Sequence, residues 1–138
     1  MSDALQFARD YQKRIAFVQH LKIVTDALGK GTATLSLPVE PHLTNSLGTV
    51  HGGVITSLLD VALCTAARTL HPESQGVITI NLSTSFIGAG NGARLIAEAR
   101  VLKDGRSVSF VEGEAKNHDG SLVAKAIATV RVLLKEKP

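Results

Sequence analysis

The hydrophobic and polar positions change their spacing along the chain, and each spacing predicts a different element. In residues 1–17, apolar side chains recur every three or four positions: Leu5, Ala8, Tyr11 and Ile15. Ser2 and Asp3 stand before this run, where N-cap residues are found. The spacing predicts a short amphipathic helix at the N-terminus.

Two regions with other patterns follow. In residues 20–41, apolar and polar residues alternate on both sides of Gly29-Lys30-Gly31, and prolines close the segment, which predicts a β-hairpin. In residues 52–70, nearly every face of a helix would be apolar, and the run is too long for one strand. A helix of this kind has to be surrounded by protein, so we expect it at the centre of the fold.

The second half of the chain alternates as strands do. Alternating runs extend from Ile78 to Leu134, and Asp104-Gly105 and Asp119-Gly120 separate the last three of them. Asp-Gly between two alternating runs is a strong hairpin signal. We therefore expect a four-stranded meander after the central helix. Together these elements predict a single α+β domain over residues 1–138, in which a curved antiparallel sheet wraps around one long helix.

Composition narrows the classes of protein to which the chain can belong. Its 15 Lys and Arg against 12 Asp and Glu form no basic stripe, and aromatic residues are few, which disfavours nucleic-acid binding. A single cysteine, Cys64, excludes an internal disulfide and is expected in the core, and the five histidines have no metal-binding spacing. No run suits a membrane span or a secretory signal, so we expect a cytoplasmic protein. We also expect no metal and no cofactor.

Asp60 is the residue on which a chemical role for the central helix depends. Between His51 and Arg68 it is the only side chain expected to be charged, and it lies beyond the first turn, so the helix dipole does not account for it. An unpaired carboxylate in apolar surroundings should have a raised pKa, which suits a general base or a nucleophile. The alternative interpretation is that Asp60 lies on a solvent-exposed stripe or caps a neighbouring backbone group.

The start of the same helix offers a second chemical group. His51-Gly52-Gly53 leaves the first backbone N–H groups open to a ligand, and such groups suit a carbonyl oxygen that becomes an oxyanion. The alternative is that the glycines only permit close packing against a strand. Gly52 and Asp60 are eight residues apart, which is about 12 Å along a helix. A site that uses both on one carbon atom would therefore combine two chains, and we expect a homodimer.

Residues 45–53, NSLGTVHGG, followed by Asp60 in the helix, resemble the signature of hotdog-fold acyl-CoA thioesterases. The resemblance is closest to the phenylacetate-degradation (PaaI) type, and the order of the elements extends it over residues 20–134. It implies an acyl-CoA substrate, no cofactor, and a homodimer or homotetramer in which two sheets pair.

The resemblance also implies a role for each matching residue. Asp60 would activate water or attack the thioester, and the N–H of Gly52 from another subunit would polarise the thioester carbonyl. Asn45 would help to hold the water or the reacting sulfur. His51 would shape the entry of the helix, and Gly53 would lie beside the substrate.

The chain departs from the family pattern after the central helix. Relatives carry Ser or Thr near the start of the next strand, in contact with the catalytic water, and the aligned residue here is Ile78. Thr79 stands next to it as a candidate substrate contact, and strand alternation directs it to the face opposite Ile78. Relatives also carry an Arg-Pro or Ser-Pro step after this strand, where this chain has Gly88-Ala89-Gly90.

Arg106 is the candidate contact for the CoA end of a substrate. It follows the turn at Asp104-Gly105 and matches a position that approaches the nucleotide phosphates in relatives. The forked donors of Arg suit phosphate, and the alternative interpretation is a solvated charge on a hairpin.

These observations predict an enzyme that hydrolyses the thioester bond of acyl-CoA. A non-catalytic acyl-CoA-binding module is the alternative, but it would normally need an output domain, for which the N-terminal segment is too short. A hotdog hydratase or dehydratase is a third interpretation, which Thr65 disfavours because those relatives carry His at that distance from the Asp. Medium-chain, arylacetyl and hydroxyaryl acyl groups all stay open as substrates.

Overall fold

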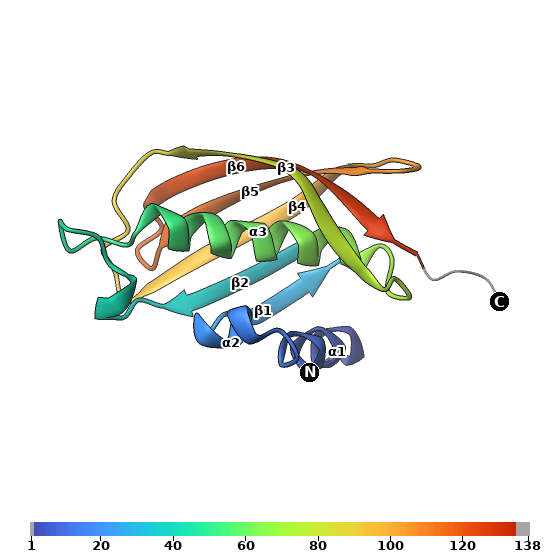
Figure 1. Ribbon diagram of the computed structural model, residues 1–138, viewed down its shortest axis with the longest axis horizontal. Coiled ribbons are helices and arrows are strands. Elements are labelled where there is room, and N and C mark those ends of the chain that lie inside the picture. Colours follow the sequence, from blue (N-terminus) through green and yellow to red (C-terminus); the bar gives the residue numbers. More distant parts are fainter. Residues whose placement is uncertain (1, 135–138) are drawn as a thin grey trace.

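Six antiparallel strands curve around one long helix in the computed structural model, which describes residues 2–134 (Figure 1). The helices are α1 (Asp3–Gln12), α2 (Ala16–His20) and α3 (Gly52–Thr69), with a 3₁₀ turn η1 at Pro41–Leu43. The strands are β1 (Val24–Gly29), β2 (Thr32–Pro38), β3 (Gly76–Phe86), β4 (Arg94–Asp104), β5 (Ser109–Asn117) and β6 (Leu122–Leu133). This arrangement confirms the expected α+β class. None of the helices within residues 2–134 has the length and hydrophobicity needed to cross a membrane.

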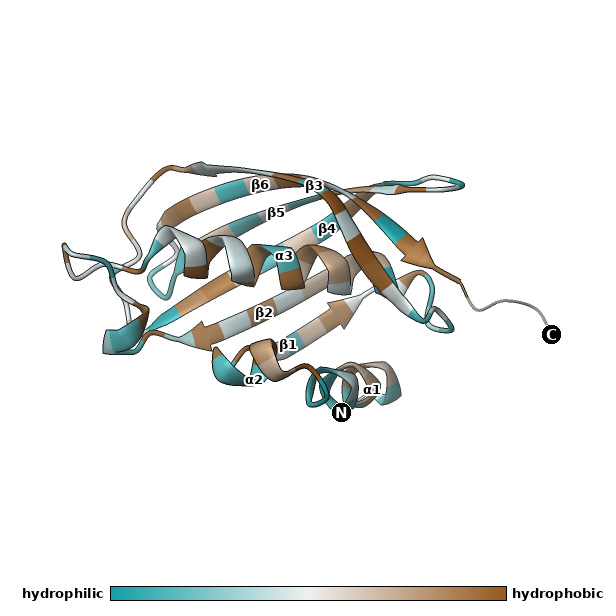
Figure 2. Cartoon of the chain, viewed as in Figure 1, coloured by the Kyte–Doolittle hydropathy of each residue, from teal (hydrophilic) through white to brown (hydrophobic). Residues whose placement is uncertain are grey.

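α3 lies against the sheet because one side of it is entirely apolar. The buried residues of that side are Ile55, Leu58, Leu59, Ala62, Leu63, Ala66 and Ala67. They meet inward-facing residues of the sheet, among which Leu35, Leu95 and Val111 are fully buried, and Figure 2 shows the hydrophobic bands on these elements. The apolar composition of α3 predicts that protein surrounds the helix on every face. The opposite side of α3 is only half-buried, so a single chain does not fulfil this expectation.

The N-terminal helix is shorter than its hydrophobic spacing predicts. Ser2 caps α1 as expected, since its Oγ accepts a hydrogen bond from Leu5 N at 3.2 Å. The helix ends at Gln12, which is buried and accepts a hydrogen bond from Thr25 Oγ1 at 2.5 Å. Ile15 is extended and precedes the separate helix α2. The buried amide of Gln12 therefore connects the last residue of α1 to β1, beside which α1 lies (Figure 1).

The three expected hairpins are confirmed. β1 and β2 pair across Gly29-Lys30-Gly31, and Gly31 has a φ of +76°, a conformation that glycine adopts without strain. β4 and β5 pair across the turn after Asp104, and β5 and β6 pair across Asp119-Gly120. Each of these turns depends on residues that are neighbours in the chain.

The expected four-stranded meander is wrong, because β3 lies at the edge of the sheet beside β6 while β4 pairs with β2. The glycine-rich segment after β3 is a crossover and not a hairpin turn. A Cβ on Gly88 would lie 2.6 Å from the carbonyl oxygen of Leu122, and one on Gly90 would lie 2.8 Å from Val50 Cγ2. These glycines therefore allow the connection to pass closely over the end of the sheet.

A β-bulge in β3 decides which of its side chains face α3. The register of β3 on β6 shifts between Thr79 and Asn81, which leaves Ile80 as an extra residue and reverses the alternation. Thr79 consequently faces α3, whereas Ile78 and Ile80 face outward and are 51% and 56% exposed. Thr79 lies on the face opposite Ile78, as strand alternation predicts, but Thr79 and not the aligned Ile78 faces the helix.

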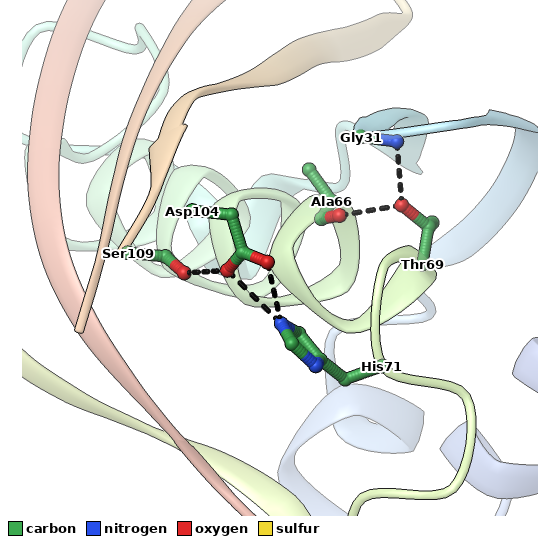
Figure 3. Close-up of polar contacts among 6 residues, drawn as sticks. All are labelled: Gly31, Ala66, Thr69, His71, Asp104 and Ser109. Atoms are coloured by element: carbon green, nitrogen blue, oxygen red, sulfur yellow. Dashed lines mark hydrogen bonds and ion pairs between the residues drawn. The ribbon is translucent and has the colours of Figure 1, made fainter. Parts of the chain in front are cut away.

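Two hairpins anchor the C-terminal end of α3 (Figure 3). Thr69 Oγ1 accepts a hydrogen bond from Gly31 N at 2.8 Å, in the β1–β2 turn. His71 Nε2 lies 2.9 and 2.8 Å from the two carboxylate oxygens of Asp104 at the end of β4, and Ser109 Oγ donates to the same carboxylate. Burial alone would raise the pKa of Asp104, but the hydrogen bonds from Ser109 and His71 outweigh it and hold that pKa below its ordinary value.

Candidate active site

Asp60 projects from the middle of α3 toward β3 and is half-buried. Its Oδ1 accepts a hydrogen bond from Thr79 Oγ1 at 2.6 Å. Thr79 has a single hydroxyl proton, so the Cys64 thiol, with Sγ 3.2 Å from Thr79 Oγ1, is the donor in that second contact. Asp60 is therefore paired and does not lie on a solvent-exposed stripe. Its Oδ2 accepts no hydrogen bond from residues 2–134 and is the oxygen that a ligand can reach.

Cys64 packs against the hydrophobic core, as expected, and also belongs to this hydrogen-bonded chain. It is half-buried and lines a cavity beside Asp60. Burial raises the pKa of the Cys64 thiol to about 11, and the charge of Asp60 adds to this effect. The thiol is protonated at neutral pH and is not a nucleophile. Within residues 2–134, the His, Cys, Asp and Glu side chains form no group of three that could hold a metal ion.

The start of α3 presents one free backbone N–H group. His51 caps the helix, and its Nδ1 accepts a hydrogen bond from Gly53 N at 2.9 Å, so the Gly53 N–H is engaged within the protein. The Gly52 N–H donates to no acceptor within residues 2–134. The Phe86 ring lies beside it, since a Cβ on Gly52 would be 3.3 Å from Phe86 Cε1. Gly52 thus offers a hydrogen-bond donor at the positive end of the helix dipole.

Asn45 organises the loop that leads into α3. Its Oδ1 accepts hydrogen bonds from Leu47 N at 2.9 Å and Thr49 N at 3.2 Å, and its Nδ2 donates to Thr49 Oγ1 at 2.9 Å. The contacts that the structure shows for Asn45 are therefore those of a turn. Its role toward a catalytic water stays a prediction.

A cavity of about 810 Å³ extends along the half-buried side of α3. Asp60, Cys64 and Arg68, which recur at every fourth residue, line one wall, and α1 supplies much of the opposite wall. Most of the lining is apolar. The volume and the character of the lining are those of a site for a small organic molecule.

Arg68 lies two helical turns from Asp60 and packs against aromatic rings of α1. Its guanidinium carbon is 3.4 Å from the centroid of the Tyr11 ring and 5.4 Å from that of Phe7. Neither Arg68 nor Tyr11 is identified as a site residue from the sequence. The four-residue spacing from Asp60 through Cys64 to Arg68 could have shown their common face. The position of α1 could not, because it depends on packing between distant segments.

The structure does not bring all the predicted site residues together in one chain. Gly52 and Asp60 lie on the same helix, so their separation stays about 12 Å along its axis. Arg106 is exposed in the β4–β5 turn. The contact between His71 and Asp104 holds this turn beside the C-terminal end of α3, whereas Gly52 lies at the N-terminal end. Arg106 makes no ion pair within residues 2–134.

Comparison with known proteins identifies the family. The thioesterase superfamily model matches residues 47–124. Acyl-coenzyme A thioesterase 13 of Homo sapiens is 25% identical over 124 residues, which cover 88% of this chain and 84% of that protein. The crystal structure of a thioesterase family protein from Silicibacter pomeroyi has a TM-score of 0.88 and 29% identity and covers 96% of this chain and 99% of that one. The PaaI protein from the phenylacetic acid degradation operon of E. coli has a TM-score of 0.85 and 22% identity, with 94% and 93% covered. The expected resemblance is confirmed, and the chain belongs to the thioesterase superfamily, whose hotdog fold it adopts.

Proposed function

We propose that the protein hydrolyses acyl-CoA thioesters to the free acid and CoA. The observation that carries this proposal is the state of Asp60, whose Oδ1 is held by Thr79 while Oδ2 is open beside an apolar cavity. The similarity to a human protein named acyl-coenzyme A thioesterase supports the choice of substrate. No metal or cofactor is part of the proposed reaction.

Asp60 acts on the carbonyl carbon of the thioester. As a general base, its carboxylate takes a proton from water while the water oxygen bonds to that carbon. As a nucleophile, Oδ2 bonds to the carbon directly, and water hydrolyses the resulting anhydride. In both routes the C–S bond breaks and the CoA sulfur leaves with a proton. The hydrogen bond from Thr79 keeps the carboxylate in one orientation through these steps.

Gly52 stabilises the charge that develops on the thioester oxygen. Its N–H lies at the start of an 18-residue helix and has no other acceptor within residues 2–134. A hydrogen-bond donor that is already positioned for a developing oxyanion raises kcat by about 10²–10³-fold. His51 holds the first turn in shape by capping Gly53 N, and Gly53 and Asn45 form the wall of the substrate site around the Gly52 donor.

The Gly52 donor and the Asp60 carboxylate of one site come from two copies of the chain. They are too far apart on one helix to act on the same carbon. β3 is the edge strand that suits the pairing of two copies, because it is 11 residues long and Ile78, Ile80 and Phe86 are more than half exposed on it. A two-fold dimer contains two such sites, and pairs of dimers give a homotetramer. Arg106 binds the CoA phosphates through its forked donors.

Release of free thiol from a panel of acyl-CoAs tests the proposed function. The wild-type protein should release thiol, and Asp60→Asn should lower kcat by about 10³-fold, with an unchanged circular dichroism spectrum and melting temperature. Cys64→Ala is the matched control, since Cys64 lies one turn further along the same cavity wall. Near wild-type turnover by Asp60→Asn on every thioester would contradict the assignment. Saturable binding of acyl-CoA without thiol release by the wild type would indicate a non-catalytic binding module instead.

A further inference from the structure

Arg68 is a cation at the wall of an apolar cavity, and residues 2–134 supply no anionic partner for it. Its guanidinium packs against the rings of Tyr11 and Phe7 on α1. No carboxylate within residues 2–134 forms an ion pair with it, although Asp3 and Asp60 also line the cavity. Its Nε is buried and donates to no acceptor. A guanidinium charge beside apolar surface is costly without a counter-charge, and because the Arg68 side chain lines the cavity, an anion bound there could supply it.

Two further cations lie near Arg68, at the end of a cavity whose lining also includes the carboxylates of Asp3 and Asp60. Arg14 lies over the Tyr11 ring at 5.0 Å from its centroid, and Lys30 lines the same cavity from the β1–β2 turn. Burial, followed by the influence of Arg14, lowers the pKa of Arg68, which the contact with Tyr11 opposes. An anion beside Arg68 would therefore gain from the two cations that line the cavity, Arg68 and Lys30.

We propose that this end of the cavity is a subsite for a carboxylate at the far end of the acyl group, and that Arg68 determines specificity for it. The proposal rests on the proposed function, since it takes Asp60 as the reacting end. The guanidinium lies at the cavity wall beside the two rings, and its forked N–H donors match a carboxylate. The substrate class is then an acyl-CoA with an apolar chain and an acidic end.

The cavity also limits the length of this chain. Arg68 is eight residues beyond Asp60 on α3, which is about 12 Å along the axis. An extended chain advances by about 1.2 Å per bond, so about eight to ten carbons separate the thioester from the carboxylate. The volume of about 810 Å³ accommodates such a chain together with water.

The test compares two substrates that differ only at the far end. An acyl-CoA of about eight carbons that ends in a carboxylate is assayed beside the methyl-ended acyl-CoA of equal length. We expect kcat/KM of the wild type to be at least about tenfold higher for the carboxylate, and Arg68→Met to reduce this ratio about 10- to 100-fold. A purely structural role of Arg68 would change both substrates equally and leave the ratio unaltered.

Arg14→Met is the matched control, because Arg14 also contacts the Tyr11 ring but does not line the cavity. This variant should keep the wild-type preference. Equal use of both substrates by the wild type, or an unchanged ratio in Arg68→Met, would overturn the subsite while the proposed hydrolysis stands.

If the wild type hydrolyses no thioester, the proposed function is wrong. A binding titration then tests separately whether the cavity binds a carboxylate at Arg68. Tyr11 is the only tyrosine and the chain has no tryptophan, so its fluorescence reports on occupancy of the cavity. Octanoate is the probe, since its carboxylate would lie at Arg68 and its tail would run toward Asp60. We expect a saturable change that is about tenfold weaker in Arg68→Met. The absence of a saturable change in the wild type would overturn the subsite.

Discussion

The two ends of α3 supply different kinds of chemistry. At its start, Gly52 contributes a backbone N–H group, and its missing side chain leaves room for the Phe86 ring. From its middle onward, Asp60, Cys64 and Arg68 contribute side chains, and each depends on a partner from a distant segment. A backbone donor is present wherever a helix begins, whereas a carboxylate needs neighbours that hold it in one orientation. The chemical group at the start of α3 therefore depends only on local backbone structure, whereas the groups from its middle onward depend on tertiary packing.

Of the changes that test this comparison, replacing Gly52 should give the largest effect, because proline removes the N–H group and still fits the first turn of a helix. Proline suits the first position of a helix, and that N–H has no acceptor in residues 2–134 to lose. We expect Gly52→Pro to lower kcat about 10²–10³-fold relative to Gly52→Ala, which keeps the N–H and adds the same Cβ beside Phe86. Steady-state thiol release measures the pair, and equal rates in the two variants would exclude the backbone donor.

Mixing variants then tests whether the two ends act across copies of the chain. Asp60→Asn and Gly52→Pro subunits, unfolded and refolded together, form mixed dimers in which one site has both groups intact. Random pairing should restore about one quarter of the wild-type activity. No recovery on mixing would place both groups of a site on the same chain.

Loss of the Thr79 hydroxyl should have an intermediate effect on the second end of α3. Thr79→Val keeps the shape of the side chain but removes the donor that holds Asp60 Oδ1. A neutral partner of this kind is worth about 1–1.5 kcal/mol, so we expect kcat to fall about tenfold at neutral pH. Cys64→Ala removes the other group that touches Thr79 and should change kcat no more than about twofold. An equal loss in both variants would show that packing, and not the bond to Asp60, is responsible.

The smallest effect is expected where α3 is anchored to the β4–β5 hairpin. Asp104→Asn weakens the contacts with His71 and Ser109 and should lower the melting temperature at pH 7 by about 3–5 °C. The pKa of Asp104 is lowered in the folded state, so its contribution is present above the unfolded pKa of about 4 and is lost as the pH falls below that value. The gap between wild type and variant should shrink on acidification below about pH 4. A gap that is independent of pH would exclude the carboxylate as its cause.

The hairpins and the central helix could be predicted because their signals are local. Asp104-Gly105 and Asp119-Gly120 specify turns through their own backbone preferences, and the apolar run of residues 52–70 is long enough to exclude a strand. The place of β3 could not be predicted in the same way. Its glycine-rich connection fits a turn as well as a crossover, and close contacts with Val50 and Leu122 exist only in the folded chain.

The residues of the candidate site likewise differ in whether the sequence alone could identify them. The sequence identifies Asp60 and Gly52 because a lone acid in an apolar helix and a double glycine at its start stand out from their surroundings. The sequence places Thr79 opposite Ile78 but does not show that this face is the one toward Asp60, since one extra residue at Ile80 reverses the alternation between the two halves of the strand. Arg68 was missed, because a charge near the end of a helix is unremarkable until Tyr11 from α1 lies against it.

By itself, the sequence determined what depends on neighbouring residues: the hairpin turns, the extent of the central helix, and the positions of Gly52 and Asp60 along it. Only the tertiary structure decided which strand lies beside β6, that Thr79 holds Asp60, and that α1 covers a cavity reaching to Arg68. Backbone and capping preferences act within a few residues and can be recognised along the chain. Register and packing join segments that are far apart in it, and their energies are set only when the whole domain folds.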